Sequence, residues 1–196
     1  MKKVISIILL SIFVSGCGPE VKPIDDYTDR SIIYGWVDLT GVSANTVTGI
    51  HLYQHGVASG SSFSSAAHNK FKSGYLFFHP GLKKGAYRLS RIDGKSCLGP
   101  MCSNTFYSYS FGNQGKVGTF KVTNPKVIHI GSFKLKKDTT NLLNSIIGYK
   151  PGKFSIVRSD NPPSRKELLT EILRLYKAKK TDPIVLKRIQ MELNKL

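Results

Sequence analysis

The hydrophobic positions between residues 31 and 135 fall into short runs separated by turn-forming residues. Where a run alternates, as in Phe106–Phe111, every second residue points to one face, which places Tyr107, Tyr109 and Phe111 together. Short strands, regular turn signals and no intervening helix predict a mainly β fold, an antiparallel sandwich or barrel. We expect strands at Ile32–Val37, Ile50–Tyr53, Tyr75–Phe78, Ala86–Ile92, Phe106–Phe111, Val117–Val122, Val127–Leu135 and Phe154–Val157.

Two segments between these runs have the composition of turns and loops. Asn113-Gln114-Gly115 can close a hairpin from Phe106–Phe111 onto Val117–Val122. Serine, glycine and alanine dominate from Ser59 to Ala67, and their small side chains cannot form a core. We therefore expect a flexible surface loop at this second segment.

The pattern takes on a helical period after Asn161-Pro162-Pro163. Ser164 and Glu167 have the spacing of a capping box, and Pro183 stands at the first position of a second helix. Two short amphipathic helices cannot bury their apolar faces alone, so we expect them to pack on each other and on the sheet. Docking on a partner protein or lying on a membrane surface are the alternatives. The apolar positions are Leu168, Leu169, Ile172, Leu173, Leu175, Tyr176, Val185, Ile189, Leu193 and Leu196.

The chain begins with a positive pair, Lys2 and Lys3, followed by a hydrophobic run of about eleven residues from Val4 to Val14. A membrane-spanning helix needs roughly 20 such residues, so the run is typical of a cleaved leader. Val14-Ser15-Gly16-Cys17 resembles the lipobox of bacterial lipoproteins. The resemblance implies that Cys17 becomes the first mature residue, anchored in the membrane by palmitate-type acyl chains. Gly18 in place of Asp favours the outer membrane in a Gram-negative envelope.

A second resemblance lies within the expected β region. Pro80-Gly81 followed by Gly85-Ala86-Tyr87-Arg88-Leu89 resembles the signature of prealbumin-like (transthyretin-like) β-sandwiches, and Asn124–Gly131 resembles a late strand of such domains. The likeness covers about residues 31 to 135. It implies a binding or scaffolding module in a fold family that hosts few enzymes.

These features divide the chain into four parts. We expect a signal peptide at 1–16, a lipidated tether at 17–30 that is extended or disordered, a β-sandwich at 31–158 and a helical hairpin at 159–196.

The net charge and the cysteines indicate which cell compartment and which partners to expect. The net charge of +17 falls to +15 when Lys2 and Lys3 are removed, and such a basic chain attracts anionic partners. In an envelope these are lipid head groups, lipopolysaccharide or cell-wall glycan, and an exported chain would rarely meet nucleic acid. Lysine also serves solubility and protects strand edges. After lipidation of Cys17, Cys97 and Cys102 form an even pair, which predicts a structural disulfide.

No motif for catalysis stands out. Gly94-Lys95-Ser96 lacks the earlier glycine of a phosphate-binding loop, and His51 and His55 lie too far apart on a strand to share one metal ion. We therefore expect no catalytic residues, no metal site and no cofactor. The expected role is a non-catalytic structural or protein-interaction module, with a binding module for an anionic envelope polymer as the alternative and an enzyme third.

Overall fold

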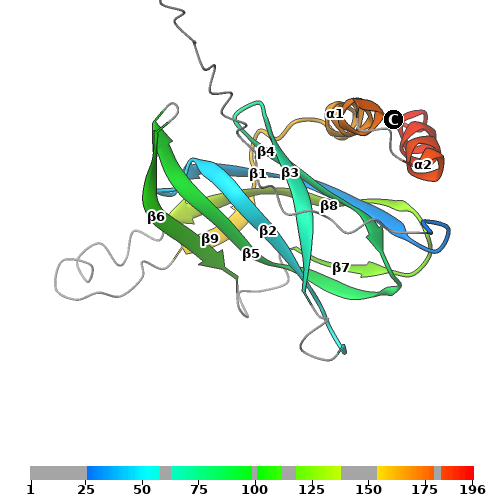
Figure 1. Ribbon diagram of the computed structural model, residues 1–196, viewed down its shortest axis with the longest axis horizontal. Helices are drawn as coiled ribbons and strands as arrows, with labels where there is room; N and C mark the ends of the chain where they lie inside the picture. Colours follow the sequence, from blue (N-terminus) through cyan, green and yellow to red (C-terminus); the bar gives the residue numbers. More distant parts are fainter. Residues whose placement is uncertain (1–25, 58–62, 99–100, 112–117, 138–153, 179–181) are drawn as a thin grey trace, which may run out of the picture.

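The computed structural model describes residues 26–57, 63–98, 101–111, 118–137, 154–178 and 182–196. The leader, Cys17 and the Asn113-Gln114-Gly115 turn lie outside these residues. The described part is mainly β with two C-terminal helices, as predicted (Figure 1). Its elements are β1 Ser31–Gly41, β2 Thr46–Gln54, β3 Phe63–Phe71, β4 Gly74–Leu82, β5 Gly85–Leu98, β6 Met101–Ser110, β7 Thr119–Val122, β8 Val127–Lys137, β9 Phe154–Arg158, α1 Arg165–Ala178 and α2 Pro183–Leu193.

The strands form one curled sheet with the order β6-β5-β2-β3-β4-β1-β8-β9, and β7 lies beside β5. Strand β3 joins the two halves, because its first part pairs with β2 and its second part, from Ala67 onward, pairs with β4. The expectation of a purely antiparallel sandwich is wrong at one pair, since β1 and β8 run parallel. Parallel strands need a long connection, and strands β2 to β7 supply it between β1 and β8. The hydrophobic pattern of each strand by itself does not show which distant strand it pairs with.

Strand β1 is buried on both faces. Ile33 and Val37 point into the curled sheet, whereas Tyr34 and Trp36 point the other way, toward the helices, and all four are at most 1% exposed. Neighbouring β4 alternates in the same way. Because side chains alternate along a strand, an unbroken hydrophobic run here means that both faces are covered.

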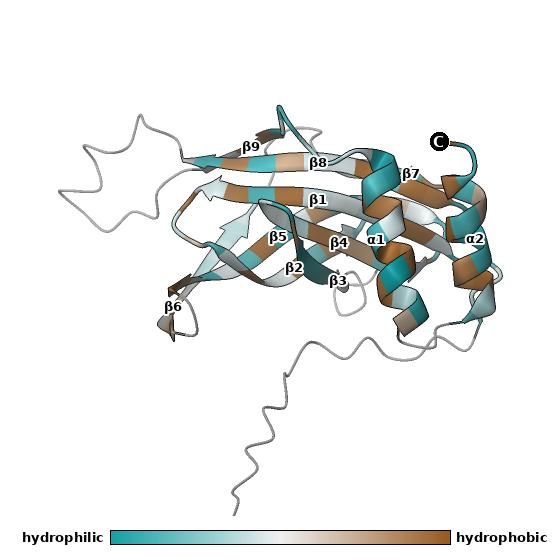
Figure 2. Cartoon of the chain, turned by 90° about the horizontal axis from the view of Figure 1, so that it is seen from above, coloured by the Kyte–Doolittle hydropathy of each residue, from teal (hydrophilic) through white to brown (hydrophobic). Residues whose placement is uncertain are grey.

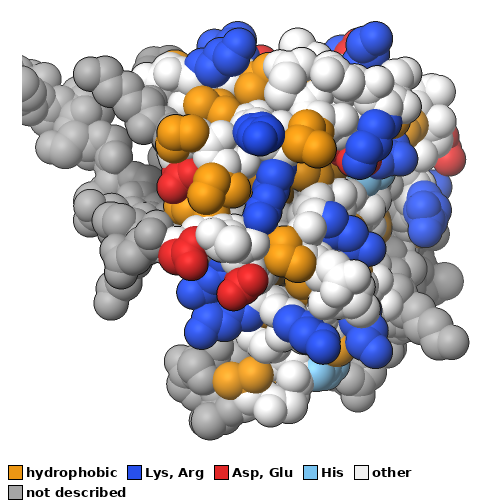
Figure 3. Space-filling view, turned by 90° about the vertical axis from the view of Figure 1, so that its right-hand side faces the viewer, with side chains coloured by type: hydrophobic (Ala, Val, Ile, Leu, Met, Phe, Trp, Pro, Cys, Tyr) orange, Lys and Arg blue, Asp and Glu red, His pale blue; other side chains and the backbone are white. Residues whose placement is uncertain are grey.

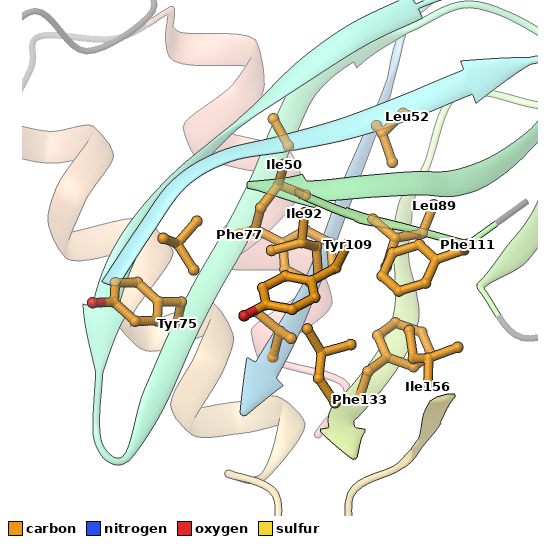
Figure 4. Close-up of a cluster of buried hydrophobic side chains, with 14 of the residues drawn as sticks. Ile50, Leu52, Tyr75, Phe77, Leu89, Ile92, Tyr109, Phe111, Phe133 and Ile156 are labelled. Atoms are coloured by element: carbon orange, nitrogen blue, oxygen red, sulfur yellow. The ribbon is translucent and has the colours of Figure 1, made fainter. Parts of the chain in front are cut away.

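The concave side of the sheet holds the larger core. Figure 4 shows side chains from both ends of the sheet meeting there: Tyr109 lies on β6 and Phe111 directly after it, Phe133 lies on β8 and Ile156 on β9. The predicted shared face of Tyr107, Tyr109 and Phe111 is therefore confirmed, and it faces this core. The other labelled members are Ile50, Leu52, Tyr75, Phe77, Leu89 and Ile92.

The two helices cover the convex side of β1 and β4. The capping box is present, since Glu167 N donates to Ser164 Oγ at 3.2 Å and Ser164 N donates to a Glu167 carboxylate oxygen at 2.8 Å. Asp182 caps α2 ahead of Pro183. Figure 2 shows the helices side by side across one end of the sheet. Of the expected apolar positions, those buried against Ile32, Tyr34, Trp36, Leu76 and Phe78 are Leu168, Leu169, Ile172, Tyr176, Val185 and Ile189. The helices thus pack on each other and on the sheet.

Helix α2 also holds the start of the described chain. Arg30 N donates to Tyr27 O at 3.1 Å, which closes a turn, and the Arg188 guanidinium donates to the carbonyl oxygens of Tyr27, Thr28 and Arg30 at 2.6–2.9 Å. The expectation of an extended or disordered tether through Arg30 is therefore wrong for its last residues. The carbonyl groups of these residues accept hydrogen bonds from a cationic side chain on a helix far away in the sequence.

Two further expectations are corrected. Phe63–Ala67, expected to belong to a loop, forms the first part of β3, because backbone pairing with β2, and with β4 from Ala67 onward, outweighs the weak strand propensity of serine and alanine. β7 does not form a hairpin with β6. Both strands pair with the long β5, where β6 occupies Arg91–Leu98 and β7 occupies Gly85–Arg88.

Candidate functional site: the convex face of strands β2, β3 and β5

The convex face of β2, β3 and β5 differs from the face that the helices cover. Ile50 and Leu52 of β2 point into the core, so the intervening His51 and the following Tyr53 point outward, where both are partly exposed. Among the described residues, no helix side chain belongs to a cluster with them. We call this surface the open face. Its outward residues are His51, Tyr53, Phe63, Ser65, Arg88, Arg91 and Asp93, and Lys95, Ser108, Ser110, Thr119 and Lys121 extend it.

A polar cluster occupies the middle of the open face. Asp93 Oδ2 lies 2.9 Å from His51 Nε2 and 3.0 Å from Arg91 Nε. Arg91 Nη2 lies 3.2 Å from the same histidine nitrogen, and Ser65 Oγ lies 3.4 Å from His51 Nδ1. Strand register produces this cluster, because His51 stands opposite Ser65 on one side and Arg91 on the other.

Ser65, His51 and Asp93 lie in one chain of contacts, and serine, histidine and aspartate are the residue types of a catalytic triad. Their geometry, however, differs from that of a triad. Ser65 lies within a strand and not on a sharp turn that would expose its hydroxyl. Backbone N–H groups of a strand point toward neighbouring strands in the sheet, where they cannot stabilise an oxyanion above its face. This arrangement favours a cross-strand polar network over catalysis.

An aromatic cluster lies beside the polar one. The Tyr53 ring contacts Phe63 edge-on at a centroid distance of 5.2 Å and His55 at 5.1 Å. The Arg88 guanidinium stands over the same ring, 5.0 Å from its centroid. Phe63 is 60% exposed. The guanidinium of Arg88 and the rings of Tyr53 and Phe63 therefore lie close together, and a ligand could contact a positive charge and flat aromatic surfaces at one position.

Positive charge surrounds these clusters. From residue 39 to residue 137 the chain contains thirteen Lys or Arg residues and a single acid, Asp93. Figure 3 shows one side of the molecule, on which Lys and Arg side chains are spread among hydrophobic ones. Some basic residues, such as Lys72 and Lys134, pair with acids outside the open face. The basic character therefore extends beyond the open face, and a test of this face needs a control that removes the same charge elsewhere.

The cysteines lie at one end of the same half of the sheet. Cys97 and Cys102 stand opposite each other on β5 and β6, and their sulfur atoms are at disulfide-bonding distance. Leu98 and Met101, the pair between the two cysteines in this hairpin, are 81% and 72% exposed. The expected pair is thus brought together, whereas Cys17, the expected lipidation site, lies outside the described residues.

Of the remaining histidines, His79 is buried, and His68 and His129 are partly buried. Burial lowers the pKa of His79 to about 4, with nearby Arg30 adding to the effect, and Gly81 N donates to its Nδ1. Burial also lowers the pKa of His129 to about 4 and that of His68 by a smaller amount. Within the described ranges, no group of three or more His, Cys, Asp or Glu side chains is arranged to hold a metal ion.

Sequence patterns alone missed the open face. Alternation in β2 predicts that His51 and Tyr53 point outward together, but Phe63 and Arg88 join them only through strand pairing. One feature of the sequence could have indicated this face. Asp93 is the sole acid between residues 39 and 137, and in the structure it contacts His51 and Arg91 there.

Comparison with known proteins adds no relative. The chain matches no protein-family model, and no curated protein is significantly similar to it. Neither helix in the described part of the chain is long and apolar enough to cross a membrane.

Proposed function

We propose that this chain is a lipid-anchored protein of the bacterial cell envelope, acting as a non-catalytic interaction module at the periplasmic membrane face. The observation that carries the interaction role is the open face, where cationic, aromatic and hydroxyl side chains gather without helical cover. The lipobox-like Val14-Ser15-Gly16-Cys17 supports the anchor. Two or more acyl chains on Cys17 suffice for stable membrane attachment. The outer membrane is favoured in a Gram-negative source.

Several features support a non-catalytic role. The polar cluster around His51 has its serine inside a strand. The prealbumin-like signature at Gly85–Leu89 implies a binding or scaffolding module. The sheet is curled and mixed, so the prealbumin-like fold itself is part of the proposal.

A protein partner on the C-terminal helices is a second candidate. The apolar stripes of α1 and α2 are used in the core, which leaves Ile184, Met191 and Leu196 at 39–54% exposure as the apolar contacts that α2 and its C-terminal end could offer. This surface is smaller and less varied in chemistry than the open face. We therefore place the main interaction on the open face.

The anchor is tested by Cys17→Ser in the native host, with metabolic acyl labelling and membrane fractionation. We expect the wild type to take up label and to sediment with membranes, and the variant to do neither while staying folded. Label on the variant, or none on the wild type, would refute the anchor.

A further inference from the structure

We propose that the open face binds an anionic glycan of the cell wall, with Arg88 and Arg91 pairing with its carboxylates and Tyr53 and Phe63 packing on its sugar rings. This inference rests on the proposed function, because it assumes that the chain is held in the envelope, where such a polymer is within reach.

The open face carries an excess of positive charge. Arg88, Arg91, Lys95 and Lys121 all lie on outward positions of β5 and β7, and Asp93 is the single acid among the outward residues of the open face. Arg91 keeps a 45% exposed side chain although it pairs with Asp93. Its guanidinium therefore still presents N–H groups to solvent, and arginine binds carboxylates through paired N–H donors. The charge complement of this surface is an anion.

The shape and the side-chain types of the open face suit a sugar polymer. Phe63 and Tyr53 form an edge-on pair on a convex sheet surface. Ser65 and Thr119 add hydroxyl groups on neighbouring strands, and Ser108 and Ser110 add two more farther away on β6. Aromatic rings pack on the apolar faces of sugar rings, while hydroxyl and guanidinium groups hydrogen-bond their edges. Because these residues lie side by side on an exposed surface, they suit an extended chain that lies across the strands.

Several anionic polymers could meet a basic surface of this kind. Nucleic acid and lipopolysaccharide phosphates would also be attracted by this charge. A chain held at the periplasmic membrane face is next to the cell wall, whose glycan carries carboxylates on its peptide stems. The mixture of guanidinium groups, exposed rings and hydroxyls matches a polymer with alternating sugar surface and carboxylate, so we commit to the cell-wall glycan.

The test is cosedimentation of the full-length protein, solubilised in detergent, with purified cell-wall sacculi. Two double variants remove the same charge from different places: Arg88→Gln with Arg91→Gln on the open face, and Lys166→Gln with Lys187→Gln on exposed positions of the helices. A third variant, Tyr53→Ala, removes the stacking ring and keeps every charge. Lipopolysaccharide vesicles and double-stranded DNA serve as competing probes, and circular dichroism checks that each variant is folded.

We expect the wild type and the helix double variant to sediment with sacculi alike. The open-face double variant should bind about tenfold more weakly, which corresponds to roughly 1.4 kcal/mol, and Tyr53→Ala should bind several-fold more weakly. Equal losses in both double variants would show attraction by net charge alone and overturn the proposal. Absence of binding to sacculi, or preference for DNA or lipopolysaccharide over them, would overturn it as well. The Cys17→Ser fractionation is independent of these assays, so a failed anchor and a failed glycan site are told apart.

Discussion

The two halves of the sheet carry different sequence patterns because different things lie on their convex sides. In the half formed by β1 and β4, helices cover that side, and Ile32–Val37 and Tyr75–Phe78 are hydrophobic at nearly every position. In the half formed by β2 and β5, the same side is exposed, and Ile50, Leu52, Leu89 and Ile92 alternate with polar or partly exposed residues. The first half contributes stability through two cores, whereas the second leaves one side for recognition.

The largest effect should come from removing the helices. Deletion of Ser164–Leu196 exposes Tyr34, Trp36 and Leu76 to water, and each large buried apolar side chain contributes about 1.5–3 kcal/mol. We expect a loss of several kcal/mol in the free energy of unfolding and a much lower melting temperature by circular dichroism. A truncated protein that melts within about two degrees of the full-length protein would show that the helices do not complete the core.

Two aromatic residues on the same convex side allow a direct comparison of the halves. Trp36, which is 1% exposed and donates through Nε1 to Phe71 O, should cost about 3–5 kcal/mol when replaced by alanine. Tyr53→Ala on the open face should cost about 1 kcal/mol, because it loses mainly ring contacts. Urea denaturation measures both. Similar losses at the two positions would contradict the difference between the halves.

Acid should weaken the fold through His79 on β4. Its folded-state pKa of about 4 lies below the ordinary value near 6.5, so the unfolded chain binds the proton more readily. Stability is therefore complete above about pH 6.5, falls as the pH drops from 6.5 to 4, and levels off below. Each pKa unit corresponds to about 1.4 kcal/mol, which makes the loss from His79 about 3–4 kcal/mol.

The variant His79→Asn keeps an acceptor for Gly81 N but cannot take up a proton in this range. We expect the difference in unfolding free energy between pH 7 and pH 4.5 to shrink in this variant. An unchanged difference would exclude His79 as the source of the acid sensitivity.

The smallest effect concerns the contact between α2 and the turn at Tyr27–Arg30. Arg188→Gln removes a charged donor from three carbonyl groups, and we expect a local loss of about 1 kcal/mol, seen as roughly fivefold faster hydrogen exchange at the Arg30 amide. Lys187→Gln removes the same charge from the neighbouring exposed position and should leave the exchange rate unchanged. Equal acceleration in both variants would show that net charge, and not the contact, protects the turn.

Local patterns were sufficient for most of the elements, with β3 as the exception. Strand positions from Ile32 to Leu135, the Ser164–Glu167 capping box and Pro183 at the start of α2 follow from alternation, helical period and backbone chemistry, which act within a few residues. The pairing of Cys97 with Cys102 also depends on neighbours in sequence, since a single hairpin brings them together.

Pairing across the chain was decided only by the tertiary structure. The parallel contact between β1 and β8 and the placement of β7 on β5 join segments that lie far apart in the sequence, and the strand at Phe63–Phe71 forms only through pairing with β2 and β4. The open face has the same origin, because Phe63, Arg88 and Asp93 reach Tyr53 and His51 through register alone. Backbone hydrogen bonding is nearly the same for every residue type, so the sequence determines which segments become strands, and the packing of the whole chain determines which strands become neighbours.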